Sequence, residues 1–113
     1  MPGETDDFFE DLGRRGHEPL LEKAKGRIKF ELTDGGKTER WIVAVDNGDI
    51  AVSRKNGRTD CTARTTKKLF EELVRGRENA MAAALRGAIQ LDGDPELLMF
   101  FQRVLPGPEG GPR

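Results

Sequence analysis

The chain has 113 residues, 35% hydrophobic and 35% charged, which predicts one globular domain spanning residues 1–113. Its formal net charge of −1 provides no overall positive field to favour nucleic acid. No apolar run reaches the roughly 18 residues that a membrane-spanning helix needs. The single cysteine excludes an internal disulfide. Together with an acidic N-terminal stretch and a C-terminus unlike a peroxisomal address, it predicts a cytoplasmic protein.

The N-terminal part of the chain is predicted to form a short helix. Residues 1–5 are expected as a flexible lead, and Asp6 can cap a helix that ends near Gly13 or Gly16. Helical spacing turns three apolar side chains inward: Phe8, Phe9 and Leu12. Acidic residues surround the two phenylalanines, and anionic lipid surfaces repel such a segment. We therefore expect these rings to pack against the domain, without stable membrane insertion.

A second helical turn is expected next. It opens at Glu18 and Pro19 and ends at Gly26. The side chains expected to face inward are Leu20, Leu21 and Ala24. The only histidine, His17, lies at the junction of the two helical segments. A surface or capping role is the ordinary one for a histidine at a turn.

Three strands joined by tight turns are predicted, at residues 27–33, 40–46 and 49–54. A period of two gives them a shared buried face, whose members are Ile28, Phe30, Leu32, Trp41, Val43, Val45, Ile50 and Val52. The second strand also carries Ile42 and Ala44 on its other face, which is typical of an interior strand. Because Asn47 and Gly48 form a two-residue hairpin signal, we expect an antiparallel meander.

A fourth strand is predicted over residues 59–64. In it, Cys61 and Ala63 alternate with polar residues, so Cys61 is interpreted as a small buried apolar residue. A nucleophilic cysteine needs a base beside it, and no feature of the sequence brings the distant His17 close. We therefore expect both Cys61 and His17 to be dispensable for function.

Two helices and a fifth strand follow. Thr66 can cap a helix over residues 67–75. The next helix, residues 78–85, consists mostly of small side chains, with Met81 and Leu85 as its bulky pair. Small residues let a helix lie close to a sheet, or leave room for a ligand. The inward side chains of the fifth strand are Ile89 and Leu91.

The last predicted helix is more apolar than a surface helix needs to be. Asp94 is its expected N-cap, and Pro95 takes the first helical position. One arc of about 160° contains Leu97, Leu98, Phe100, Phe101, Val104 and Leu105. Met99 lies on the opposite side. So large an apolar face must cover either an ordinary core or a cavity that holds an apolar guest. Residues 106–113 are expected to form a flexible tail.

An ordered set of residues in this region carries a family resemblance. The set consists of Asp60–Thr62 at a strand, Phe70 and Leu73 on a helix, Gly76, Asn79, Gly87, and a short strand closing at Gly93–Asp94. In order and spacing it resembles the sterol carrier protein type 2 family of lipid-binding domains. The resemblance extends back to the strands at Gly26 and Trp41, so it covers most of the chain.

The resemblance and the strand pattern together predict an α+β fold. We expect a five-stranded mixed sheet, mainly antiparallel, with helices covering one face and the other face largely open to solvent. By resemblance, the fourth strand crosses over to pair elsewhere in the same sheet. The family also implies an apolar tunnel that holds lipids and an absence of catalytic residues.

Signals for other chemistry were not found in the sequence. No His, Cys or carboxylate spacing resembles a metal site, no glycine-rich cofactor motif is present, and the aromatics take core-facing positions unlike those of an RNA reader. We therefore expect no enzymatic activity, no metal, no cofactor and no nucleic-acid partner.

Two functional interpretations remain. The first is non-catalytic binding and transfer of a fatty acid, an acyl-CoA or a sterol-like lipid in an apolar cavity between sheet and helices. The side chains expected to line that cavity are Trp41, Phe70, Leu73, Met81, Leu85, Leu97, Leu98, Phe101 and Leu105. The second is a protein-interaction or accessory module of the same fold. In this interpretation side chains fill the cavity, and the domain acts together with a partner enzyme.

Overall fold

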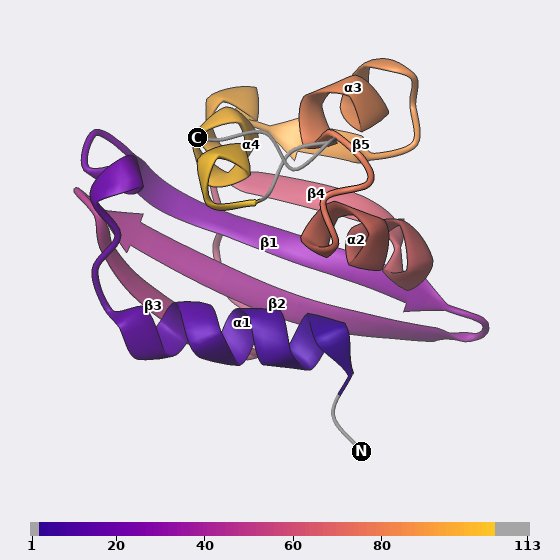
Figure 1. Cartoon of the computed structure of the whole chain (residues 1–113), viewed down its shortest axis with the longest axis horizontal. Helices are drawn as coiled ribbons and strands as arrows, with labels where there is room; N and C mark the ends of the chain where they lie inside the picture. Colours follow the sequence, from indigo (N-terminus) through magenta and orange to yellow (C-terminus); the bar gives the residue numbers. More distant parts are fainter. Residues whose placement is uncertain (1–2, 106–113) are drawn as a thin grey trace.

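A computed structural model describes residues 3–105 of the chain (Figure 1). In chain order its elements are α1 (Glu4–Arg15), the 3-10 turn η1 (Pro19–Leu21), β1 (Lys25–Asp34), β2 (Lys37–Asp46), β3 (Asp49–Ser53), β4 (Cys61–Thr66), α2 (Lys67–Val74), α3 (Ala80–Leu85), β5 (Gln90–Gly93), α4 (Pro95–Phe101) and the 3-10 turn η2 (Gln102–Val104). The tail expected at residues 106–113 lies outside the described residues.

The five strands form one mixed sheet in the order β3-β2-β1-β4-β5. All neighbouring strands are antiparallel except β1 and β4, which are parallel. The β2–β3 hairpin turns at Asn47 and Gly48, whose φ angles of 51° and 95° are the left-handed values that a tight hairpin needs. The predicted α+β fold, the antiparallel meander and the hairpin are therefore confirmed.

The segment of residues 54–60 carries the chain from the β3 edge past β2 and β1 to β4. Asp60 fixes its far end: the Arg27 backbone N–H donates to Asp60 Oδ2 at 2.9 Å, and the Asp60 N–H donates to the Arg27 carbonyl at 2.8 Å. A Cβ atom at Gly93, where φ is +99°, would lie 2.2 Å from the Asp60 carbonyl oxygen. This close approach of two backbones requires glycine.

The helices cover one face of the sheet. In Figure 1, α1 lies along the β3 side, whereas α2 and α4 both pack on β1 and β4. Because α1 also contacts α2, the covering continues over the central strands. The face that they cover bears Ile28, Phe30 and Leu32, all buried, so the predicted strand register is confirmed.

Two details near the N-terminus differ from the prediction. α1 begins at Glu4 instead of Asp6, with Gly3 as its N-cap, so Glu4 and Thr5, which were expected in a flexible lead, are helical. Leu20, expected inward, is exposed, whereas Leu21 is buried. In a 3-10 turn successive side chains point about 120° apart, so only one of these two leucines can face the core.

The outer face of the sheet is less open than predicted. Ile42 and Thr62 flank Lys29 across three strands, and Ile42 is only 4% exposed. The Lys29 ammonium reaches Asn56 Oδ1 at 3.5 Å, and the hydroxyls of Thr59 and Thr62 are also 3.5 Å apart. The crossover segment 54–60 therefore lies against the centre of this face.

Candidate functional site

An apolar interior separates the sheet from the helices. One buried cluster contains seven of the nine side chains expected to line a cavity: Trp41, Phe70, Leu73, Leu97, Leu98, Phe101 and Leu105. They come from β2, α2, α4 and the residue after η2, which are far apart in the sequence. The fold thus brings them together, while their role as ligand contacts remains a prediction.

The two remaining candidates lie on α3, and they differ. Met81 is half-buried and packs against the cluster. Leu85, by contrast, is 86% exposed, so its assignment to the interior was wrong. Ala80 and Ala83 are the buried residues of α3, and Leu85 lies roughly 170° around the helix from their mean direction. Because α3 docks through its alanines, Leu85 is turned to solvent.

Aromatic rings form the centre of the interior. The Phe9 ring stacks on Trp41 at 4.7 Å between centroids and on Phe70 at 5.2 Å. Phe30 and Phe101 meet at 4.7 Å in a tilted arrangement. Phe9 and Phe30 were expected to face inward but were not placed at the site. Their contacts with Trp41, Phe70 and Phe101 make them part of it.

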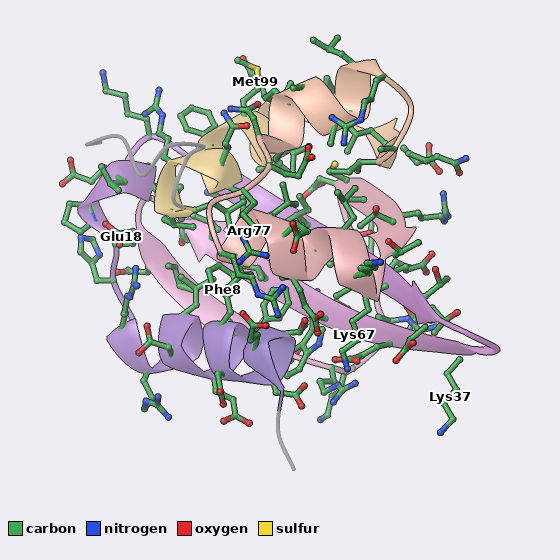
Figure 2. The ribbon with its side chains drawn as sticks, turned by 45° about the vertical axis from the view of Figure 1, so that its right-hand side comes forward. Phe8, Glu18, Lys37, Lys67, Arg77 and Met99 are labelled. Carbon is green, nitrogen blue, oxygen red and sulfur yellow. The ribbon has the colours of Figure 1, made fainter. Side chains whose placement is uncertain are left out.

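Phe8 lies at the seam where three helices meet. Its ring contacts Phe9 on its own helix, Phe70 on α2 and Phe101 on α4, each edge to face at centroid distances of 5.3, 5.8 and 6.0 Å. Figure 2 shows the side chain pointing from α1 toward the other helices. The side chain is only partly buried, so Phe8 separates the ring cluster from solvent at this seam. The expectation that Phe8 and Phe9 pack against the domain is confirmed.

Polar groups enclose the Trp41 edge of the interior. The indole N–H donates to Glu39 Oε1 at 2.8 Å, and Lys67 Nζ lies 3.1 Å from Glu39 Oε2. Burial raises the pKa of Glu39, but hydrogen bonds from Trp41 and Lys67 outweigh it and leave the pKa below its usual value. The Arg54 guanidinium lies 4.4 Å from the centroid of the Trp41 ring.

A surface groove of about 640 Å³ leads to the same edge. It runs between α1 and β3. Its lining includes Phe9, Gly13, Trp41, Val52 and Arg54. The Phe9–Trp41 stack thus forms one wall of the groove and also belongs to the buried cluster. The groove therefore borders the interior at this ring stack.

The two residues considered for chemistry are far apart. Burial, with the nearby charges of Asp94, Asp92 and Asp60, raises the pKa of Cys61 to about 11, so its thiol stays protonated and a poor nucleophile. His17 Nδ1 lies 2.8 Å from Asp49 Oδ1 beside β3. Three strand steps of roughly 4.8 Å separate β3 from β4, about 14 Å in all, so His17 cannot serve Cys61 as a base.

Residues 3–105 lack two features that would indicate other functions. No group of three or more His, Cys, Asp or Glu side chains in this range is placed to hold a metal ion. Nor does any helix in this part of the chain combine the length and apolarity needed to cross a membrane.

Comparison with known proteins connects the fold to a family. The sequence model of the SCP-2 sterol transfer family matches residues 9–106. The chain belongs to this family. Sterol carrier protein 2 from Homo sapiens is 30% identical over 90 residues, which are 77% of this chain and 16% of that protein. The chain thus spans only about one sixth of the length of such curated relatives.

Two solved structures share the fold. Sterol carrier protein 2 from Aedes aegypti, in complex with palmitate, is similar with a TM-score of 0.68 and 21% identity, over 91% of this chain and 94% of that one. The sec-alkylsulfatase Pisa1 from Pseudomonas sp. is similar with a TM-score of 0.71 and 20% identity, over 89% of this chain and 16% of that one. The SCP-2 fold therefore occurs both as nearly a whole chain and as a small part of an enzyme.

Proposed function

We propose that the chain binds an elongated apolar ligand, of the fatty acid, acyl-CoA or sterol-like class, between the helices and the sheet. It would sequester or carry this ligand without transforming it. The observation that carries the proposal is the buried cluster itself, in which α1, α2 and α4 turn aromatic and branched apolar side chains onto the inner face of the sheet. Thr5 and Thr62 are the only buried polar residues among residues 3–105, and Thr62 lies on the outer face.

Support also comes from the family. Its model is described as a sterol transfer family, and the Aedes aegypti protein of the same fold forms a complex with palmitate. The Pseudomonas sp. structure motivates a different role, that of an accessory module within a longer enzyme chain. A ligand-binding measurement separates these two roles.

A ligand must separate side chains that contact one another in this structure. Edge-to-face ring contacts contribute only about 0.5–1.5 kcal/mol each beyond area burial, and Phe8 makes three of them at a seam that reaches solvent. Displacement of Phe8 would open the cluster without breaking a backbone hydrogen bond of the sheet. Entry at the α1–α2–α4 seam is therefore part of the proposal.

The driving force is the burial of the alkyl chain. Each buried methylene contributes about 0.8 kcal/mol, so twelve contribute roughly 10 kcal/mol before the costs of association and ordering. Those costs leave a dissociation constant near the micromolar range. Affinity should rise about fourfold per methylene and then level off once the interior is full.

The test is a titration of fatty acids of increasing chain length against the wild type and two variants of α4. Phe101→Asp places a carboxylate on the buried side, where its desolvation is costly, and should abolish binding. Met99→Asp is the matched control, because Met99 is 52% exposed, and it should bind like the wild type.

Because Phe101→Asp can also disrupt folding, Phe101→Leu provides a second measurement. It keeps the site apolar but removes part of a ring, so the chain length at which affinity levels off should increase. Weak affinity at every chain length in the wild type would refute the carrier proposal and leave the accessory module.

A further inference from the structure

The inward face of α1 has one polar member. Thr5, Phe8, Phe9 and Leu12 fall within an arc of about 100° on the helix, and all four are buried or half-buried. Thr5 occupies the middle of this arc, one helical turn before the two phenylalanines. It is 0% exposed. Its hydroxyl is therefore enclosed at one end of an otherwise apolar stripe.

The Thr5 hydroxyl lacks a hydrogen-bond partner. Oγ1 of Thr5 forms no hydrogen bond with any group in the part of the chain that the structure describes. Buried hydroxyls are nearly always paired, since an unpaired one loses its hydrogen bond to water without replacement. The Thr5 hydroxyl is therefore free to donate a hydrogen bond to, or accept one from, a polar group that enters the interior.

Thr5 directly follows a carboxylate that is already paired. Its neighbour Glu4 accepts hydrogen bonds from Arg75, which follows α2 and also pairs with Glu72. The first turn of α1 itself carries three carboxylates, Glu4, Asp6 and Asp7. A ligand carboxylate brought to this end of the interior would be desolvated and would meet the negative charge of these side chains. A neutral oxygen would meet neither cost.

We propose that Thr5 Oγ1 holds the polar end of the bound ligand by a hydrogen bond, and that it favours a neutral oxygen, as in a long-chain alcohol or ester, over a carboxylate. The alkyl chain would extend from Thr5 along the stripe, beside the rings of Phe8, Phe9 and Phe70. This inference rests on the proposed function, because it assigns an orientation and a head-group class to a ligand of the same interior.

The experiment compares Thr5→Val with Thr5→Ser. Valine keeps the branched shape and removes the hydroxyl, whereas serine keeps the hydroxyl. The probes are 1-hexadecanol, palmitate and hexadecane, each measured by displacement of one fluorescent fatty-acid probe. In the wild type, hexadecanol should bind more tightly than palmitate at pH 7. Thr5→Val should weaken hexadecanol binding about fivefold and leave hexadecane unchanged, and Thr5→Ser should stay close to the wild type.

Unfolding of the ligand-free variants gives a second measurement. Because Thr5→Val removes an unpaired buried hydroxyl, its melting temperature should be higher than that of the wild type. Equal hexadecanol affinity in the wild type and Thr5→Val would overturn the inference while leaving lipid binding intact. Tighter binding of palmitate than of hexadecanol, reduced in Thr5→Val, would overturn the choice of a neutral oxygen. Failure of all three probes to bind the wild type would refute the proposed function as well.

Discussion

The two faces of the sheet exclude water in different ways. On the inner face, Phe30 sits among Phe9, Phe70 and Phe101, with centroid distances of 4.7–5.6 Å. On the outer face, Ile42 is about as buried as Phe30, at 4% against 2% exposed. Its neighbour across the sheet is Lys29, whose ammonium is held by Asn56 and Glu31.

The contacts of the two faces differ in how strictly they fix the geometry of the side chains. Apolar contacts on the inner face have no direction, so the same side chains can repack around an alkyl chain. Contacts on the outer face have defined geometry, such as the Arg64 Nε–H that donates to Glu31 Oε1 at 2.8 Å and the Asp60–Arg27 pair at the start of β4. We infer that the outer face keeps the strands in register while the inner face adapts to its content.

The largest expected effect compares Phe30→Ala with Ile42→Ala. Each should lower the free energy of unfolding substantially, by about 3–5 kcal/mol for Phe30→Ala and about 2–5 kcal/mol for Ile42→Ala, as measured by urea denaturation. Only Phe30→Ala should change the fatty-acid chain-length profile, because only Phe30 borders the proposed ligand space. An altered profile in Ile42→Ala, with Phe30→Ala unchanged, would reverse the roles assigned to the two faces.

Much of this two-sided arrangement could be predicted from the sequence. In a strand the side chains alternate with a period of two, so the pattern of Ile28, Phe30 and Leu32 assigns a whole face. The hairpin at Asn47–Gly48 and the cap at Asp94 rest on local chemistry and were also correct: Asp94 Oδ1 accepts the Glu96 N–H at 3.0 Å. Such features depend on few residues and on no distant partner.

The features that could not be predicted depend on docking. The alanine-rich α3 carries too little amphipathic signal to decide which side packs, so Leu85 was placed inside although it faces solvent. The burial of Thr5 follows from the packing of α1 on β3 and α2, and that of Ile42 from the path of the crossover segment. A local pattern gives the direction of a side chain within its element but not the neighbour that covers it.

A smaller effect should test the polar contacts of the outer face. Burial raises the pKa of Glu31, but its hydrogen bond from Arg64 and the charges of Lys29 and Arg64 outweigh it, so the pKa lies below its usual value of about 4.5. A carboxyl with a lowered folded-state pKa stabilises the fold above its unfolded pKa, and this contribution is lost as pH falls through the folded value.

Glu31→Gln should therefore unfold at lower urea concentration than the wild type at pH 7. The gap between the urea midpoints of the two proteins should narrow as the pH falls below about 4.5. Added salt should also narrow it, since Arg64 is only half enclosed. Lipid affinity should stay unchanged. A gap that is constant from pH 7 to pH 3 would show that the charge of Glu31 contributes nothing to the outer face.

The smallest effect is expected at Cys61, which lies on the inner face but outside the proposed lining. It pairs with Ile28 on one side and Gly93 on the other, at the start of β4, directly after Asp60, whose hydrogen bonds to Arg27 hold the chain there. Cys61→Ala removes one sulfur and should lower the free energy of unfolding by about 1 kcal/mol or less, with lipid affinity unchanged.

The thiol of Cys61 should also react slowly. With its pKa raised to about 11, about one thiol in a thousand is ionised at pH 8, so iodoacetamide should modify the folded protein far more slowly than the unfolded one. A folded Cys61→Ala variant that no longer binds fatty acid would extend the lipid site to the start of β4. The inner face would then not divide into a ring cluster that adapts to a ligand and a strand start that stays fixed.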